Sequence, residues 1–442
     1  MNRIGLTCLV VFSFAALASA APLSLKAALE EGMKRNLDIQ KSELGTNNID
    51  AQVDAAFRRY LPQVTASGTV THLWMDPVRI PDPFIAQMLG VPVNEVSINW
   101  NVAGSLNFSQ FLYVPQALTG IKMAKKGKEI DALGKMELRE GIIFGIAMQY
   151  WVIVYMEENL EVLKRSKDNL SKTQSMIEAM VEQGIAKRSD LNTMTINLAA
   201  LSTQIDNLST QIRSQKDALL QIMGRSPGEE ISLTDRLNID SRNSNSISGN
   251  PLQNSITLKR MEQQIKLQEM NIDLVAQEMY PSVVAFASYG TQASRENFDF
   301  FNSPQDKFKD DGKLGVSVSV PIFDGMSNRA KRSSAQIQKR QLELDMEKQK
   351  LALQATYENA KAVLFNAQKL VERNEKSANL AEENYLMKEL EYKEQVAPIT
   401  DLLTADNNMQ TAYSNLINAL YTEKTAELAL EQVLGILRHR AE

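Results

Sequence analysis

The long proline-free stretch between Pro115 and Pro227 limits most strongly how this chain can fold. It is rich in Ala, Leu, Glu, Lys and Gln, and its one strong interruption lies near Gly184. We predict two helices of about 68 and about 35 residues, the first on the order of 100 Å long. The same pattern returns over 327–395 and 399–437. Helices of this length cannot pack inside a compact domain, so they predict a coiled-coil-like architecture.

Alternating apolar and polar residues predict four strands, arranged as two pairs: 62–74 with 97–111, and 282–289 with 314–322. In the second of these segments, apolar residues alternate with Ser and Asn rather than with charged residues. Small uncharged groups on one face and apolar groups on the other fit a transmembrane barrel strand between lumen and lipid. An amphipathic strand of a soluble sandwich is the alternative for this segment taken alone.

The first twenty residues have the pattern of a secretory signal peptide. Arg3 precedes an apolar stretch over 4–16, and small residues at 18–20 provide a cleavage site. Cys8, the one cysteine of the chain, lies within this segment. We therefore expect a mature chain without disulfides or cysteine-bound metals. The formal net charge of −5 gives no reason to expect a nucleic-acid partner.

The two halves of the chain read as copies of one another. Gln110 and Pro321 are 211 positions apart, as are Asp190 and Asp401, whereas Pro62 and Pro281 are 219 apart. The change of offset falls inside the hairpins, and one register then holds through the helices. We predict these segments: a signal peptide (1–20), a first repeat (21–224) with a helical hairpin at 115–224, a linker (225–250), a second repeat (251–437) with a helical hairpin at 325–437, and a C-terminal tail (438–442).

Four strands cannot close a barrel. An open sheet edge in lipid leaves backbone groups without partners, and the smallest barrels have about eight strands. At least two chains must therefore share one barrel, with the helices continuing it as a tube. Glycines recur every seven residues at Gly120, Gly127, Gly134 and Gly141. We interpret them as a face for close helix approach, with coincidence on a tolerant surface as the alternative.

The mature chain resembles the TolC-like outer-membrane efflux proteins over its whole length. The matching segments are 24–29 at the start of the first helix, 60–64 entering the first strand, 184–191 at the first helical turn, and 318–325 leaving the fourth strand. The run Pro321, Ile322, Phe323, Asp324 and Gly325 is the most specific of them. The resemblance implies a mixed α and β membrane protein in which the duplicated strand-strand-long-helix-helix repeat forms a trimeric 12-stranded β-barrel continued by a long α-helical tunnel.

The resemblance also implies a periplasmic gate at the far end of the tunnel. Asp401 matches a constricting acidic residue, and three such carboxylates around a three-fold axis would attract cations. Tyr392 and Asp190 match positions that link neighbouring hairpins in the closed state. This chain departs from the family at Thr404, where a second acidic residue is expected, and at Ala397, where an arginine is expected.

The tips of the helical hairpins are the predicted adaptor contacts: Gly184, Lys187, Arg188, Gln395, Val396 and Pro398. Gln395 stands where a turn glycine is common in the family, so we predict that the second tip turns differently from the first. For Lys187 and Arg188, solvated turn charges are the alternative interpretation.

We therefore predict an outer-membrane exit duct of a tripartite efflux pump or type I secretion system in a Gram-negative bacterium. Its tunnel projects into the periplasm, and its partners are two further copies, a periplasmic adaptor, an inner-membrane transporter and outer-membrane lipid, without cofactor or metal. The alternative, a surface coiled-coil structural or adhesive protein, explains the helices but not the strands. An enzyme is disfavoured because His72 and His439 share no visible motif and no phosphate-binding loop occurs.

Overall fold

The computed structural model of the chain describes residues 21–74, 84, 87, 99–238, 249–295, 297–300 and 308–440. Several sequence predictions lie outside the described residues: the signal peptide over 1–20, positions 97 and 98 of the second predicted strand, 239–248 of the predicted linker, and the last two residues of the predicted tail.

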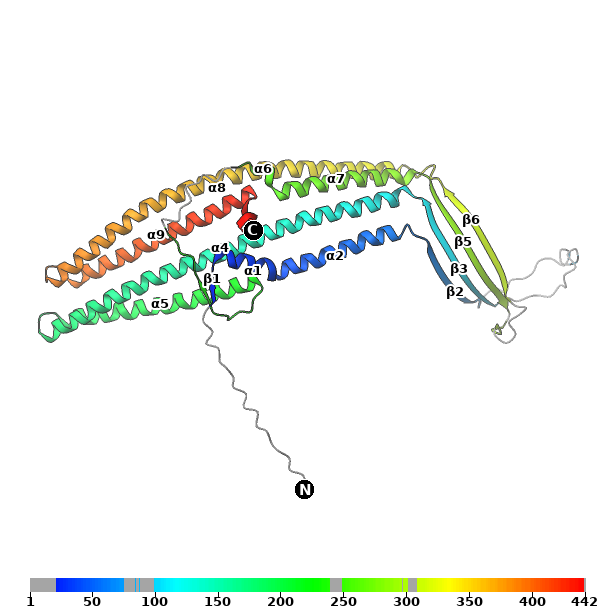
Figure 1. Cartoon of the computed structure of the whole chain (residues 1–442). Coiled ribbons are helices and arrows are strands. Elements are labelled where there is room, and N and C mark those ends of the chain that lie inside the picture. Colours follow the sequence, from blue (N-terminus) through cyan, green and yellow to red (C-terminus); the bar gives the residue numbers. More distant parts are fainter. Residues whose placement is uncertain are drawn as a thin grey trace, which may run out of the picture. The chain divides into compact units, whose positions relative to one another are not determined.

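The order of elements repeats, which confirms the predicted duplication (Figure 1). The first copy consists of α1 (Leu25–Arg35), α2 (Leu37–Arg58), β2 (Gln63–His72), β3 (Trp100–Tyr113), α4 (Pro115–Glu182) and α5 (Arg188–Met223). The second consists of α6 (Pro251–Asn254), α7 (Ile256–Ala276), β5 (Ser282–Arg295), β6 (Lys309–Ser319), α8 (Ser327–Lys393) and α9 (Ile399–Leu434). The predicted long helices are present, since α4 has 68 residues, α8 has 67, and α5 and α9 have 36 each.

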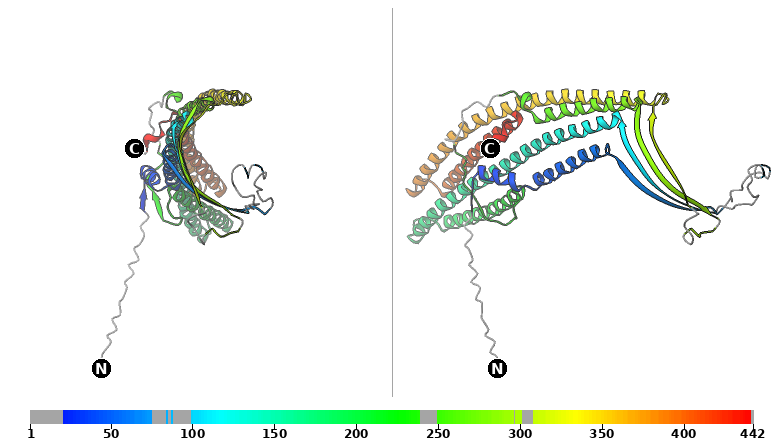
Figure 2. Two further views of the ribbon diagram at one scale, coloured as in Figure 1. Left: turned by 90° about the vertical axis from the view of Figure 1, so that its right-hand side faces the viewer. Right: turned by 45° about the vertical axis from the view of Figure 1, so that its right-hand side comes forward.

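The four long strands form one antiparallel sheet in the order β2-β3-β5-β6. The sheet is curved rather than flat (Figure 2). Its register places Ser67 opposite Ser105 between β2 and β3, and the two hydroxyl oxygens lie 2.8 Å apart. Such small polar pairs are the uncharged face that the alternation predicted.

The strands of the second hairpin extend further toward the loop than the predicted bounds of 289 and 314. β5 continues to Arg295, and β6 begins at Lys309, which pairs with Gln292. The extension contains charged residues, which is why the alternation did not reveal it. A cross-strand contact accommodates one of them, since the Tyr289 hydroxyl donates to the Asp310 carboxylate at 2.8 Å. At its other end β6 stops at Ser319 rather than 322, just before Pro321, which has no backbone N–H for a ladder.

The chain folds into two compact units. The unit of residues 44–132 and 260–346 contains the four-stranded sheet. The other unit contains residues 1–43, 133–259 and 347–442, and it holds both helical hairpin tips. Its largest core cluster includes the fully buried Tyr150, Leu29, Ile146, Leu219 and Met223.

A short parallel ladder in the second of these units was not predicted. β4 (Ile231–Leu233) lies within the predicted linker and pairs with β1 (Ala21–Leu23), far away in sequence. The Asp235 carboxylate accepts from the backbone N–H of Leu25 at 2.8 Å, and the Tyr150 hydroxyl lies 2.6 Å from the same oxygen. Asp235 thus joins the start of α1 to α4, and the segment after residue 225 is structural as well as connecting.

In each repeat, the last long helix ends at a glycine with a left-handed φ, and this glycine packs against the break between the first two helices of the same repeat. Gly224, at φ 76°, ends α5 so close to α1 that an added Cβ would lie 2.3 Å from the Arg35 carbonyl oxygen. Gly435, at φ 67°, ends α9 against Asn254 in the same manner. Because only glycine adopts this φ without cost, both close approaches depend on it.

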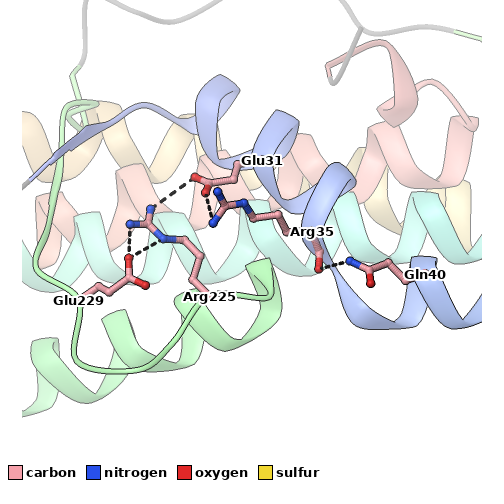
Figure 3. Close-up of polar contacts among 5 residues, drawn as sticks. All are labelled: Glu31, Arg35, Gln40, Arg225 and Glu229. Carbon is pink, nitrogen blue, oxygen red and sulfur yellow. Dashed lines mark hydrogen bonds and ion pairs between the residues drawn. The ribbon is translucent and has the colours of Figure 1, made fainter.

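Charged side chains reinforce the first of these junctions (Figure 3). Arg225 pairs with Glu229 and also lies 3.4 Å from Glu31 of α1. Glu31 in turn pairs with Arg35 at 3.4 Å, and the Gln40 amide donates to the Arg35 carbonyl at 3.2 Å. This network connects the end of α5 to the α1–α2 break.

The heptad glycines of α4 do not serve a close approach within the described part of the chain, so their interpretation as a face for close helix approach stays a prediction. At Gly120, Gly127, Gly134 and Gly141, an added Cβ would have no described atom within 4 Å outside the local helix backbone. The spacing is real, but no helix of the same chain is pressed against it in the described residues.

We predict that Tyr150→Phe loosens the β1–α1 junction, because the hydroxyl that bridges Asp235 and the Leu23 carbonyl is lost. A buried hydrogen-bonding group left unpaired costs about 1–3 kcal/mol. Hydrogen exchange of the Leu25 amide should accelerate by the corresponding factor, whereas Tyr155→Phe, whose ring packs against Tyr421, should leave it unchanged. Equal exchange rates in Tyr150→Phe and the parent chain would contradict this role.

Candidate functional site

The sequence-predicted site residues lie at the two turns that join α4 to α5 and α8 to α9. At the first turn Gly184 has φ 73°, and the N–H groups of Ile185 and Ala186 both donate to the Met180 carbonyl. These bonds satisfy carbonyls at the end of α4, as in other helix ends closed by a left-handed residue.

The second turn has the same geometry, which corrects the expectation that Gln395 would make it different. Gln395 adopts φ 61°, and the N–H groups of Val396 and Ala397 both donate to the Glu391 carbonyl. The left-handed position is therefore retained although a Cβ is present. A non-glycine residue there costs on the order of 1 kcal/mol.

The hairpin ends are held together by an apolar cluster drawn from four helices. Its buried members are Leu170, Ile177, Met194, Leu201, Tyr385, Tyr392, Ile399, Leu402, Ala405 and Met409. Because α4, α5, α8 and α9 all contribute, the two hairpins of one chain pack against each other near their tips. The gate region is therefore a packed structure within each chain and not two independent loops.

Tyr392 and Asp190 lie near enough for the carboxylate to act on the tyrosine electrostatically, and their role as a link between hairpins stays a prediction. Tyr392 is buried in this cluster, and burial followed by the nearby Asp190 carboxylate raises the pKa of its hydroxyl. Asp190 sits in the first turn of α5, where its side chain also accepts a hydrogen bond from Ser189 at 3.2 Å. This is an electrostatic interaction between α8 and α5 inside one chain.

Asp401 and Thr404 are exposed on the first turns of α9. The Thr404 hydroxyl donates to the Thr400 carbonyl at 2.7 Å, so it is satisfied by its own helix. Asp401 remains an exposed carboxylate near a helix N-terminus, where negative charge is stabilised.

The predicted adaptor-contact residues form the exposed apex of both tips. Lys187 and Pro398 occupy equivalent positions just before α5 and α9. Val396 is 76% exposed and Ile185, its counterpart in the first repeat, is 50% exposed. Each tip therefore presents an apolar side chain to solvent, and Arg188 adds positive charge to the first.

Comparisons with known proteins agree with this arrangement. Residues 248–436 match the family model described as outer membrane efflux protein. This matched segment, which is less than half of the chain, begins just before α6 and ends just after α9, so it is the second repeat that resembles outer membrane efflux proteins. No curated protein matches it in a sequence search.

Solved structures with the same fold match almost the whole chain. The outer membrane protein VceC of Vibrio cholerae is 16% identical, with 93% of this chain and 96% of that chain covered and a TM-score of 0.70. The CmeC outer membrane channel of Campylobacter jejuni is 15% identical over 93% of this chain and 85% of that chain, at a TM-score of 0.75. The open state of the MtrE outer membrane channel of Neisseria gonorrhoeae is 17% identical over 93% and 88%, at 0.71.

The whole chain has the fold of these outer-membrane channels, and its second repeat matches the outer membrane efflux protein model. These findings favour the channel over both the adhesive coiled coil and the enzyme. Among the described residues, no helix is long and apolar enough to cross a membrane. The described part of the chain also contains no group of three or more His, Cys, Asp or Glu that could hold a metal ion.

The sequence reasoning missed one polar residue in the packed end of the hairpins, Asp406. It is 2% exposed and accepts hydrogen bonds from Ser166 of α4 and Gln410 of α9. A signal was available, because Asp406 stands on the same helical face as the buried Leu402 and Met409. An acidic residue on an apolar face is uncommon unless it has partners.

We predict that Gln395→Gly stabilises the second tip, because glycine adopts the left-handed φ without steric cost. The expected gain is about 0.5–1 kcal/mol after the added flexibility of the unfolded chain is subtracted. Thermal unfolding of the detergent-solubilised protein measures it. Gly184→Gln, the mirror substitution at the first tip, should lose a similar amount. A loss of stability in Gln395→Gly would show that the glutamine side chain, rather than the backbone, sets this turn.

Proposed function

We propose that three copies of this chain share a 12-stranded barrel and form the exit duct of a tripartite pump. In this assembly a periplasmic adaptor docks on the hairpin tips, and an inner-membrane transporter supplies the energy. The observation that carries the proposal is the open four-stranded sheet, whose two outer strands are each paired on one side only in the described part of the chain.

The sheet edges need partners in lipid. Backbone N–H and C=O groups left unpaired in the bilayer cost several kcal/mol each, so spanning sheets are closed. Alternate residues of β6, including Leu314, Val316 and Val318, are apolar and exposed, as expected for a face toward lipid. The β6 edge of one copy and the β2 edge of the next supply the missing partners, and three copies of four strands give twelve.

Apolar stripes continue from both sheet edges along the helices. α8, which follows β6, exposes Ile337, Leu344 and Leu351 at seven-residue spacing. α2, which leads into β2, exposes Leu37 and Leu44 at the same spacing. Heptad-spaced apolar residues are the seam of a coiled coil. Each chain thus has two edge strands, β2 and β6, and each edge strand adjoins a helix with an exposed apolar stripe. A closed ring of copies needs such a surface on both sides of every copy.

The gate residues fit a passive duct that opens by movement rather than by chemistry. Asp190 and Tyr392 interact electrostatically between the two hairpins, and Asp401 is exposed on α9. Three Asp401 carboxylates around a shared axis would attract cations at the entrance. The name of the matching family favours efflux, and a type I secretion system uses a duct with the same requirements.

Replacing Leu351 by Glu should weaken assembly, because a charge would be buried at the proposed seam. Burial of one Leu contributes about 1.5–3 kcal/mol, and the charge adds a desolvation cost. Mass photometry in detergent should show trimers replaced by monomers. Ala352→Glu introduces the same charge at the next exposed position, away from the stripe, and should leave trimers intact. Equal trimer fractions in the two variants would contradict the seam.

Planar-bilayer recording tests the function itself. The wild-type protein should insert and conduct, and the double variant Asp190→Ala with Tyr392→Phe should conduct more because the tip interaction is lost. Each loss of about 1.4 kcal/mol from the closed state raises the open–closed ratio about tenfold. Conductance that does not differ from the wild type would reject this pair as a latch.

Asp401→Ala should weaken block of the channel by multivalent cations, since it removes the exposed carboxylate from each copy. Thr404→Ala is the matched control on the same helix, because its hydroxyl is used within α9. Undiminished block in Asp401→Ala would reject the acidic entrance.

A further inference from the structure

The buried Asp406 carboxylate connects the two helical hairpins of one chain. Its Oδ2 accepts from the Ser166 hydroxyl of α4 at 2.7 Å and from the Gln410 amide of α9 at 2.5 Å. Gln410 also donates to the Ser166 hydroxyl oxygen at 2.7 Å, which closes a three-residue network. The network spans α4 and α9, so it joins the first repeat to the second.

The network is largely buried, and one of the two Asp406 carboxylate oxygens accepts no hydrogen bond from the described residues. Asp406 is 2% exposed and Ser166 is 1% exposed. The other carboxylate oxygen, Oδ1, is buried and has no hydrogen-bond partner. A buried carboxylate with an unsatisfied oxygen is costly when ionised and much less so when protonated.

The network breaks the symmetry between the repeats. The residue 211 positions before Asp406 is Thr195, which accepts a hydrogen bond from Gln174 at 3.0 Å on the exposed surface of the first hairpin. That bond lies within one hairpin, whereas the Asp406 network crosses between hairpins. The buried carboxylate is therefore a property of the second repeat and not of the shared architecture.

We propose that Ser166, Asp406 and Gln410 form a second latch between the hairpins, one that a proton tightens. It rests on the proposed function, because it assigns a control point to the movement of the hairpins in that duct. It lies deeper in the packed end of the hairpins than Asp190 and Tyr392, and its Asp406 and Ser166 side chains are buried.

The direction of the pH effect follows from burial. Burial raises the pKa of Asp406, and the hydrogen bonds from Ser166 and Gln410 oppose this rise only in part. A carboxyl whose pKa is higher when packed than when exposed binds its proton more tightly in the packed arrangement. The packed, closed arrangement is therefore stabilised as the pH falls through the pKa of the packed state, and it is weakened at higher pH.

The groups that face Asp406 do not reverse this direction. α4 contributes the Ser166 hydroxyl, and α9 contributes the Gln410 amide. From α8, Tyr385 senses the charge of Asp406 and of Glu389, and its own pKa is raised by burial, so it stays protonated in the acidic and neutral range. The carboxylates of Asp190 and Asp401 lie at the tip surface and remain unchanged in the variants below.

Single-channel conductance of the full-length trimer at about pH 5.5 and about pH 8 tests this latch. The wild-type open–closed ratio should be lower at acid pH than at alkaline pH. The expected difference is about tenfold for each unit by which the pKa of Asp406 in the closed state exceeds its pKa in the open state. Asp406→Asn, which is neutral at every pH and keeps the acceptor oxygen, should lose most of this dependence and stay near the acid value. Ser166→Ala, which removes one donor, should raise the ratio at both pH values.

Thr195→Val is the control, because it alters the equivalent position without touching the hairpin contact, and it should retain the wild-type pH response. If Asp406→Asn keeps the full pH response and Ser166→Ala conducts as the wild type does, the latch is rejected while the channel stands. A wild-type protein that does not conduct at either pH would instead overturn the proposed duct and the latch with it. Melting temperatures of all variants show whether a change in conductance reflects a change in folding.

Discussion

Backbone hydrogen bonding in a medium without water is the constraint on which the rest of this structure depends. A sheet of four strands has two open edges, and lipid offers nothing to pair with them. The chain meets this constraint by ending its sheet with β2 on one side and β6 on the other, so that copies can join edge to edge. The exposed apolar stripes of α2 and α8 would let neighbouring copies pack along their helices as well as along their strands.

In the proposed duct, the helical part must be rigid along its length and adjustable at its end. Rigidity comes from packing where the repeats break, at Gly224 and Gly435, and from the Asp235 and Arg225 contacts nearby. Adjustability requires contacts that separate at modest cost. The tip cluster combines apolar packing with a few polar links, and such links respond to charge and protonation where pure apolar packing would not.

Much of this architecture was predictable, because it follows from periodicity. Proline-free stretches fixed the helices to within a few residues, and alternation located the strands. Contacts between distant segments were not predictable in this way. The pairing of β1 with β4 involves three residues on each side and has no sequence pattern of its own. The turn at Gln395 adopts a left-handed φ that its residue type does not favour. Asp406 could be noticed as an acidic residue on an apolar helix face, but its partner Ser166 on another helix could not be predicted. Sequence reasoning therefore failed where tertiary packing decides the outcome.

Electron microscopy of the detergent-extracted mature protein tests the central claim most directly. The account predicts a three-fold cylinder well over about 100 Å long, the length of the longest helix plus a barrel, with a detergent belt near one end. A three-fold particle with strands closed across the copies would establish that β2 and β6 are each other's partners. A thin rod without a detergent belt, or a particle in which the sheets stay open, would contradict the account.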